Sequence, residues 1–331
     1  MTKRVGVLTS GGDAPGMNAA VRTVVRAALH FNMEPWGIYR GYHGLIHGEL
    51  EPLTDRSVSG VIQRGGTILK SARSDEFRTK EGQSKALDVL AKHEIDSLVV
   101  IGGDGSFKGA LALAEAGVNV ICIPATIDND IACTDYSIGF DTAVNNVLDA
   151  VNKLRDTAAS HERVYVVEVM GRDSGYIALY SGIAGGADVI LIPEVPYDVD
   201  QVCGQIVQAN EAGKTYNIVI VAEGVKSISG ASGKTSPSFE IGNYIAEKTG
   251  YDTRITILGH IQRGGSPTVR DSLLASKLAY HAVELIYQGK TNKVLGEVNQ
   301  AVTSFDVDYA LAQEKQLNLD MYHLATVLSA I

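Results

Sequence analysis

The sequence predicts an α/β protein of two domains, each with a mostly parallel sheet covered by helices. Short runs rich in β-branched residues recur along the chain, and most are nearly continuous in apolar residues. Such runs are typical of strands that are buried on both faces. Amphipathic helical periods lie between the runs, as expected of a parallel sheet. The length of 331 residues fits two domains of about 150 residues each.

The predicted strands and helices alternate along the whole chain. An early helix has apolar residues at helical spacing from Met17 to Leu29, and a late one has them from Leu273 to Ile286. A longer helix is expected over residues 142–157. The strands are expected over residues 5–9, 36–39, 97–101, 118–123, 164–169, 189–192, 217–222 and 255–258.

Two segments interrupt this alternation. An acidic, glycine-containing loop at residues 138–142 precedes the predicted long helix and indicates a domain boundary. Residues 227–238 are rich in serine, glycine and threonine, with one proline, and they predict an exposed loop.

The net charge argues against two classes of partner. The sequence has 29 lysines and arginines against 38 aspartates and glutamates, which gives a net charge of −9. The field of such a protein opposes a nucleic acid backbone or an anionic membrane surface, so we expect neither as a partner. The apolar run near the amino terminus is too short for a signal peptide, and no run is long enough to span a membrane. The cytoplasm is therefore the expected compartment.

Cysteine and histidine positions do not predict a metal site. Cys122, Cys133 and Cys203 form no CxxC pair and have no histidine at ligand spacing, so we expect buried, inert thiols. His43 and His47 are four residues apart, as a helical metal pair would be. The glycines and the tyrosine around them favour a solvated loop instead.

The 35 glycines gather in short clusters after predicted strands, where ligand sites lie in open α/β sheets. Glycine allows positive φ and close approach of the backbone to a ligand. In the first cluster, Gly11 and Gly12 precede a helix and would present amides to a phosphate at the positive end of the helix dipole. A tight turn with Asp13 or Asn18 capping the helix explains the same residues equally well.

Two further loops have carboxylates at strand ends. Asp104 lies between Gly103 and Gly105, an arrangement that suits a Mg²⁺ ion bound to phosphate oxygens. Asp128 and Asp130 lie within one turn of the next strand end, where paired acids can supply a general base and an electrostatic partner. An ordinary acidic turn is the alternative for each loop taken alone.

Local cations in glycine-bearing contexts could hold an anionic substrate. Arginine binds phosphate through two parallel hydrogen bonds, and a net-acidic protein needs such cations for a phosphorylated substrate. A metal-binding acid, phosphate-binding backbone, a carboxylate base and arginines together predict phosphoryl transfer. The cations are Arg73, Arg163, Arg172, Arg254, His260 and Arg263.

These residues fall in motifs that resemble the bacterial ATP-dependent 6-phosphofructokinases. The motifs occur in the family's order over nearly the whole chain, and the ordered set is far more specific than GGDG alone, which NAD kinases and lipid kinases share. They are TSGGDAPGMNA (9–19), RGGTILKSAR (64–73), VVIGGDGS (99–106), TIDND (126–130), RDTAASHER (155–163), EVMGR (168–172), AEG (222–224) and LGHIQRGGSP (258–267).

The resemblance implies transfer of the γ-phosphoryl group of ATP, with Mg²⁺, to the 1-hydroxyl of fructose 6-phosphate, the committed step of glycolysis. It implies a homotetramer of subunits with two Rossmann-like domains and the active site in the cleft between them. The larger, ATP-binding domain would comprise residues 1–138 and about 261–311. The smaller, fructose 6-phosphate-binding domain would comprise residues 139–260 and about 312–331.

The resemblance also implies a role for each matching residue. Asp128 would be the base, Asp104 would hold Mg²⁺, and Thr126 and Arg172 would stabilise the phosphoryl group in transfer. ATP would be held by Gly12, Arg73, Ser74, Gly103, Asp104, Gly105, Ser106 and Gly109. Fructose 6-phosphate would be held by Thr126, Ile127, Asp128, Met170, Gly171, Arg172, Glu223, His260, Ile261, Gln262 and Arg263, and by Arg163 and Arg254 of a neighbouring subunit.

Two positions bear on the phosphoryl donor. Pyrophosphate-dependent relatives typically carry Asp where this chain has Gly105, and Lys where it has Ala125. We expect ATP as the donor, because the absent acid leaves room for the α-phosphate of the nucleotide. Ala125 is a departure from the ATP-dependent family, which usually has glycine there, but its methyl group brings no charge for pyrophosphate.

An effector site for ADP or phosphoenolpyruvate at a subunit interface is also implied. Asp55 stands where the family usually has arginine, and Ala212 where it usually has a basic residue, so we expect a blunted or altered response. Residues 227–238 resemble an insertion relative to the family. The matching effector residues are Arg22, Arg26, Arg155, Gly186, Asp188 and Lys214.

The residues leave two alternatives to this function. Another GGDG kinase, such as an NAD kinase, would not need the cations of the MGR and LGHIQRGGSP segments. A catalytically silent paralogue that senses sugar phosphates would be expected to lack Asp104, Asp128 or Arg172, and all three are present.

Overall fold

The structure is a computed structural model that describes residues 3–228 and 236–329. The chain forms two compact units: unit 1 is Met1–Thr142 with Arg263–Lys315, and unit 2 is Ala143–Gln262 with Gln316–Ile331. The chain therefore passes from one unit to the other three times. The unit boundaries follow residues 142, 262 and 315. Each lies within four residues of the domain boundaries at 138, 260 and 311 that the resemblance implies.

Unit 1 is built on a seven-stranded sheet in the order β11-β10-β5-β4-β1-β2-β3, in which the five central strands are parallel. Residues 98–101 of β4 are fully buried, as expected for an apolar strand covered on both faces. The strands are β1 (Arg4–Thr9), β2 (Glu34–Ile38), β3 (Leu50–Pro52), β4 (Ser97–Gly102), β5 (Asn119–Pro124), β10 (Lys293–Val298) and β11 (Ala301–Asp306).

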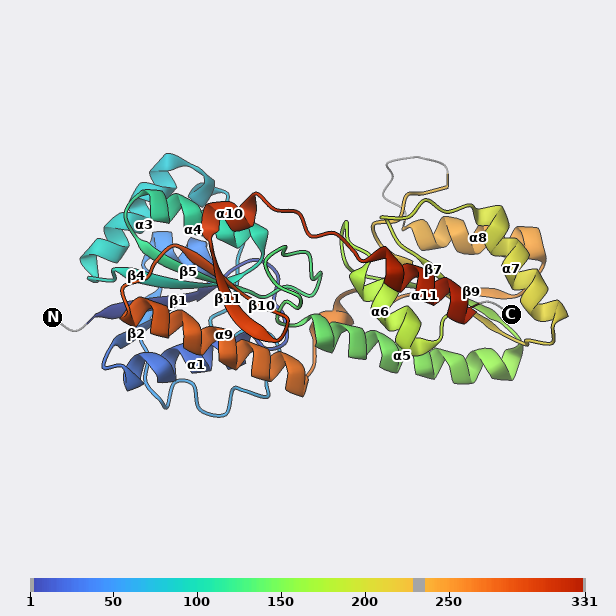
Figure 1. Ribbon diagram of the computed structural model, residues 1–331, viewed down its shortest axis with the longest axis horizontal. Helices are drawn as coiled ribbons and strands as arrows, with labels where there is room; N and C mark the ends of the chain where they lie inside the picture. Colours follow the sequence, from blue (N-terminus) through green and yellow to red (C-terminus); the bar gives the residue numbers. More distant parts are fainter. Residues whose placement is uncertain (1–2, 229–235, 330–331) are drawn as a thin grey trace. The chain divides into compact units, whose positions relative to one another are not determined.

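Helices cover both faces of this sheet. α1 (Met17–His30) packs along α9 (Val269–Tyr287) on one face, and α3 (Lys80–Lys92) and α4 (Asp104–Glu115) lie on the other, as Figure 1 shows. Both α1 and α9 turn their apolar stripes to the sheet. The remaining helical segments of unit 1 are α2 (Gly41–His47), η1 (Glu76–Arg78) and α10 (Val307–Leu311).

Unit 2 has a four-stranded parallel sheet in the order β7-β8-β6-β9. Every residue of β6 and β8 is buried, in keeping with their largely apolar sequences, and Glu168 and Asn217 are buried with the rest. The strands are β6 (Val164–Val169), β7 (Val189–Leu191), β8 (Asn217–Ala222) and β9 (Thr253–Ile257). The helices are α5 (Phe140–His161), α6 (Tyr176–Gly185), α7 (Val199–Glu211), α8 (Pro237–Thr249), η2 (Gly259–Arg263) and α11 (Leu319–Ser329).

A buried carboxylate fixes the start of α5, at the end of the first segment of unit 1. Asp271 of α9 accepts hydrogen bonds from Gly139 N (2.9 Å), Thr142 N (2.8 Å) and Thr142 Oγ1 (2.6 Å). These bonds satisfy amides that the first turn of a helix leaves without a partner inside the helix. The predicted α/β class with mostly parallel sheets is confirmed, and α5 is longer than the predicted 142–157.

Two predictions of local structure are wrong. His43 and His47 lie in helix α2 rather than in a loop, with His47 Nδ1 2.8 Å from His43 O. Gly41 begins α2 and Gly48 ends it in a left-handed conformation with φ of 70°, while Gly44 lies inside the helix. In the predicted exposed loop at 227–238, residues 229–235 lie outside the described residues, and Ser238 is buried in the first turn of α8.

The sequence did not predict three strands of the unit 1 sheet. β11 and β3 are its two edge strands, and β10 lies next to β11. β10 and β11 form a hairpin whose turn residues Asn299 and Gln300 have φ of 50° and 66°. Such a turn normally carries Asn-Gly or Asp-Gly, so Asn-Gln gives a weak signal. β3 has only three residues.

The sequence predicts buried, inert cysteine thiols. Cys122, Cys133 and Cys203 are buried and free, as predicted, and burial raises the pKa of the Cys122 thiol. No helix in the described part of the chain combines the length and hydropathy needed to cross a membrane.

Candidate active site

The carboxyl ends of β1, β4 and β5 adjoin at one edge of the unit 1 sheet. Ser10 N donates to Ile101 O (3.0 Å) and Ala125 N donates to Gly102 O (2.9 Å), so the loops that follow begin side by side. Gly102 permits this contact, because a Cβ there would lie 2.5 Å from Ser10 O. The structure therefore brings together the three loops that the sequence singled out.

The first loop is held in place by contacts to distant parts of unit 1. Gly11 has φ of 87°, and its carbonyl accepts a hydrogen bond from Ser71 Oγ (2.6 Å). Arg263 donates to Asp13 O (3.0 Å), and a Cβ at Gly12 would lie 2.6 Å from this guanidinium. Glycine at 12 thus leaves room for the guanidinium of Arg263, a residue that the resemblance assigns to the sugar phosphate.

Asn18 does not cap α1. Its amide nitrogen donates to Arg64 O (2.9 Å) and Gly65 O (3.2 Å), and its carbonyl oxygen accepts from Ile68 N (2.7 Å). α1 instead begins after Gly16, which has φ of 105°. The buried Asn18 side chain therefore fixes the segment that carries RGGTILKSAR beside the first loop.

The second loop continues directly into α4, whose first residue is Asp104. Partial desolvation raises the pKa of Asp104, and the nearby Asp130 carboxylate raises it further, while Lys108 lowers it. Two carboxylates at neighbouring strand ends are a favourable setting for a divalent cation. A Cβ at Gly105 would meet no atom within 4 Å, so the first turn of α4 is open there.

The chemistry of the site fits Mg²⁺. Among the described residues no group of three or more His, Cys, Asp or Glu side chains could hold a metal ion by themselves. Mg²⁺ is typically bound by one or two carboxylates together with substrate phosphates, so the Asp104 and Asp130 carboxylates are compatible with this ion.

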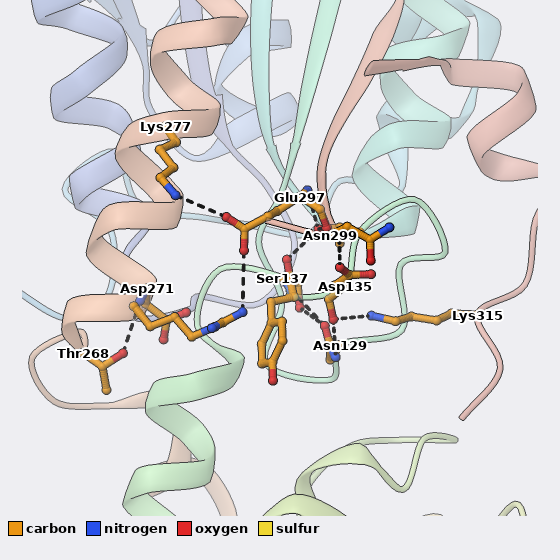
Figure 2. A network of polar contacts seen from close by, with 12 residues as sticks. Asn129, Asp135, Ser137, Thr268, Asp271, Lys277, Glu297, Asn299 and Lys315 are labelled. Atoms are coloured by element: carbon orange, nitrogen blue, oxygen red, sulfur yellow. Dashed lines mark hydrogen bonds and ion pairs between the residues drawn. The ribbon is translucent and has the colours of Figure 1, made fainter. Parts of the chain in front are cut away.

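The third loop carries Asp128 and is tightly bonded to itself. Asp128 is 1% exposed, and its amide donates to Thr126 Oγ1 (3.2 Å). Asn129 has φ of 53°, and its side-chain oxygen accepts from Ser137 N (2.9 Å), while Ser137 Oγ donates to Thr126 O (2.6 Å). Ile127 is fully buried. The Asp128 side chain is therefore carried by a turn with little freedom, part of which Figure 2 shows.

Tyr42 is a residue of this site that the sequence analysis missed. Its ring stacks on Phe77 (4.2 Å between centroids), and a Cβ at Gly109 would lie 2.6 Å from the ring. Its hydroxyl donates to Ser106 O (2.6 Å). Burial raises the pKa of Tyr42 well above its usual value, so it stays a donor. The absence of a side chain at Gly109 thus makes room for the Tyr42 ring, and nothing shows that it makes room for adenosine, as the resemblance implies.

Arg73 and Ser74 lie beside η1. Arg73 is exposed, and Ser74 Oγ accepts a hydrogen bond from Phe77 N (3.3 Å). The structure therefore uses the Ser74 hydroxyl to hold the turn, and it leaves the Arg73 guanidinium at the surface of unit 1.

In unit 2 a carboxylate shapes the turn after β6. Glu223 Oε1 accepts from Gly171 N (3.1 Å) and Arg172 N (2.8 Å), and Gln262 Oε1 accepts from Met170 N (3.2 Å). Gly171 has φ of 141°, a conformation that a side chain would disfavour. Glu223 and Gln262 thus position the MGR segment and present the Arg172 side chain at the surface.

A second carboxylate in unit 2 joins two of the predicted arginines. Asp252 Oδ2 accepts from Arg163 Nε (2.6 Å) and from Arg254 Nη2 (3.1 Å). The hydrogen bond to Asp252 raises the pKa of Arg163. The two guanidiniums are therefore held side by side at one surface of unit 2, where both remain partly exposed. Nearby in the sequence, His260 and Ile261 of η2 are exposed, and Gln262 is buried.

The predicted effector residues fall into one group in each unit. In unit 1, Arg22 and Arg26 line a cavity of about 330 Å³ with His30 and Tyr280. Arg26 Nε lies 3.2 Å from Asp55, the acid that stands where the family usually has arginine.

In unit 2 the effector residues surround the end of α6. Arg155 donates to Asn152 Oδ1 (2.9 Å) and to Gly185 O, beside Gly186. Lys214 forms an ion pair with Asp188, whose other oxygen accepts from Ile218 N (2.7 Å). Each predicted effector cation other than Arg22 thus has an acidic or polar partner within the chain.

Comparisons with known proteins agree with this geometry. A family model described as phosphofructokinase matches residues 4–286. An ATP-dependent 6-phosphofructokinase of Clostridium botulinum is 56% identical over 327 residues, 99% of each chain, and one of Halothermothrix orenii is 53% identical over 330 residues, again 99% of each. The chain belongs to the phosphofructokinase family, and the resemblance read from the motifs is confirmed.

Solved structures show the same fold. Phosphofructokinase from Saccharomyces cerevisiae matches with a TM-score of 0.86 and 33% identity over 99% of this chain. This chain spans 47% of the length of the yeast chain.

Tyr42→Phe tests whether the Tyr42 hydroxyl holds the start of α4. The variant leaves the buried Ser106 carbonyl without this donor, so we expect the free energy of unfolding to fall by about 1–3 kcal/mol. Tyr39→Phe is the matched control, because the Tyr39 hydroxyl bonds to Glu51 at an exposed position and its loss should cost less. Urea unfolding measures both, and equal losses would contradict the assignment.

Proposed function

We propose that this chain transfers the γ-phosphoryl group of ATP to the 1-hydroxyl of fructose 6-phosphate. The observation that carries the proposal is the junction of three strand ends that brings Gly12, Asp104 and Asp128 to one edge of the sheet, in a chain 56% identical to an ATP-dependent 6-phosphofructokinase. We further propose that it acts in the cytoplasm as a homotetramer. Molar mass measured together with activity tests the assembly, and a fully active monomer would refute it.

In the proposed reaction Asp128 accepts the proton of the attacking hydroxyl. Its burial and the rigid turn around it suit a base that must be positioned precisely. The hydroxyl of Thr126 and the amides at the start of α4 donate hydrogen bonds to phosphate oxygens. When bound at Asp104, Mg²⁺ supplies charge neutralisation for the phosphates.

Unit 2 carries three of the proposed cations, Arg163, Arg172 and Arg254. Arg172 stabilises the negative charge of the transferring group, which matters more than base strength in a loose transition state. Arg163 and Arg254 bind the 6-phosphate of a substrate on a neighbouring subunit.

ATP rather than pyrophosphate is the proposed donor. Gly105 leaves the first turn of α4 open for a nucleotide phosphate, and the buried Ala125 contributes only a methyl group where a cation would attract pyrophosphate. A coupled assay with fructose 6-phosphate and each donor tests this, and faster turnover with pyrophosphate would refute it.

We expect Asp128→Asn to lower kcat by about 10²–10⁴-fold, the usual contribution of a positioned base. The amide keeps the shape of the carboxylate but cannot accept the proton. Steady-state kinetics measure the effect, with circular dichroism to show that the variant is folded. Asp88→Asn, at an exposed site in α3, is the control. A folded Asp128→Asn variant with near-normal kcat would exclude Asp128 as the base.

Asp252→Asn should weaken the binding of fructose 6-phosphate. The variant removes the charge that holds Arg163 and Arg254 together, so we expect the KM for the sugar phosphate to rise about tenfold, equal to about 1.4 kcal/mol. The KM for ATP should stay the same. Asp149→Asn, which breaks the exposed ion pair with Lys153 in the same unit, is the control. A rise in the KM for ATP instead would count against the proposed role of the two arginines.

We propose that effector binding is present but weakened. The Asp55 carboxylate pairs with Arg26 at 3.2 Å, so an incoming phosphate must compete with an acid already in place. Ala212, at the end of α7, adds no cation that could compensate.

Asp55→Asn should strengthen the response to an anionic effector. Release of Arg26 from an exposed ion pair is worth about 0.2–1 kcal/mol, so we expect the ADP concentration for half-maximal effect to fall by up to about fivefold. Saturation curves for fructose 6-phosphate with and without ADP measure this. Asp88→Asn again serves as the control, and an unchanged response to ADP would show that Asp55 does not limit binding.

A further inference from the structure

The loop between β5 and α5 is fastened to the carboxyl-terminal part of unit 1 through Asp135. Asp135 N donates to Glu297 O (2.8 Å), and Asp135 Oδ2 accepts from Asn299 N (2.8 Å). The carbonyl of Asp135 accepts two further hydrogen bonds, from Asn129 Nδ2 (3.2 Å) and from Lys315 Nζ (3.1 Å), as Figure 2 shows. This carbonyl therefore links Lys315 to the residue that follows Asp128.

Lys315 is the last residue of unit 1, where the chain leaves for unit 2. Its side chain is partly buried and lies near the Asp135 and Asp130 carboxylates. Desolvation lowers the pKa of Lys315 to about 8, and the two carboxylates act to raise it. A cation thus stands beside a loop that contains Asp128, Asp130 and Asp135.

We propose that Lys315 is a positioning residue for phosphoryl transfer, which holds the Asp135 carbonyl and through it the turn that carries Asp128. This inference rests on the proposed role of Asp128 as the base. Nothing in the family motifs singles out Lys315, because it lies far from all of them in the sequence.

The turn needs such support because its backbone is strained. Asn129 adopts φ of 53°, which costs free energy for a residue with a side chain. The Asn129 side chain holds this conformation with bonds to Ser137 and to the Asp135 carbonyl. Lys315 fixes the position of that carbonyl, so its loss allows Asn129 and the adjoining Asp128 to shift. A shift of about 1 Å in a catalytic group can cost about 10²-fold in rate.

The positive charge of Lys315 also helps to hold this loop in place. Asp130 and Asp135 both lie near Lys315, and Asp130 is near enough to Asp104 to raise its pKa. Repulsion among these acids favours a more open loop. The ammonium group offsets part of this repulsion, while Lys277 and Arg270 act on Glu297, at 3.6 Å each.

The test compares Lys315→Met and Lys315→Arg with Lys92→Met, which removes a positive charge at an exposed site in α3. We expect Lys315→Met to lower kcat about tenfold or more, with the KM for ATP and for fructose 6-phosphate within about threefold of the parent. Lys315→Arg should restore most of the loss. The thermal midpoint should change little in Lys315→Met, because removal of a partly desolvated cation offsets the lost bond. It should also change little in Lys315→Arg, which keeps the positive charge.

A direct readout of the loop is independent of turnover. Amide hydrogen exchange of the peptide that spans residues 126–137 should be faster in Lys315→Met than in the parent or in Lys92→Met. Unchanged exchange and unchanged kcat would overturn the proposal. A fall in thermal midpoint that parallels the loss of activity, with no rescue by arginine, would overturn it too, in favour of a purely structural role.

A double variant separates this inference from the proposed role of Asp128. If Lys315 acts through Asp128, the effects of Lys315→Met and Asp128→Asn on kcat should be clearly less than additive. Fully additive effects would overturn the proposal for Lys315 while leaving Asp128 as the base. Near-normal kcat in Asp128→Asn alone would overturn the role of Asp128, and with it the inference.

Discussion

The close approach of β1 and β4 at Gly102 is the constraint on which the unit 1 site depends. Parallel neighbours in a sheet lie about 4.8 Å apart, so loops that leave adjacent strands meet only if nothing separates them. Gly102 leaves no side chain between Ser10 and the start of α4, and the ladder continues through Ala125. Three loops with quite different sequences thereby share one edge, which brings their backbone amides and carboxylates together.

Carboxylates organise the cations of this acidic protein. Glu223 accepts a hydrogen bond from the backbone of Arg172. Asp252 accepts hydrogen bonds from both Arg163 and Arg254, and Asp55 forms an ion pair with Arg26. Glu223 and Asp252 thus orient arginines that remain partly exposed. Asp55 instead stands where the family usually has arginine. The net charge of −9 therefore describes a protein whose positive groups are few and held in place.

The sequence predicted what depends on local pattern. Continuous apolar runs marked the buried parallel strands, and glycine-rich loops after them marked the junction at Gly102. Residues that act through distant contacts gave no such signal: Tyr42 reaches Ser106 across 64 positions, and Lys315 reaches Asp135 across 180. The loop predicted at His43 and His47 is wrong because Gly41 and Gly48 lie at the two ends of a helix and Gly44 is tolerated inside it. The Asn-Gln turn between β10 and β11 likewise lacks the residues that usually announce a hairpin.

The discontinuous make-up of unit 1 sets the order in which the sheets can form during synthesis. β5 pairs on one side with β4 and on the other with β10, where Lys293 faces Ile121. All four strands of unit 2 leave the ribosome between these two partners. At about 5–20 residues per second, synthesis of the chain between β5 and β10 takes about 10–30 s. During this time one edge of β5 is unpaired and open to misassociation. Unit 2 can therefore complete its sheet first, while the more exposed intermediate is the nascent form of unit 1.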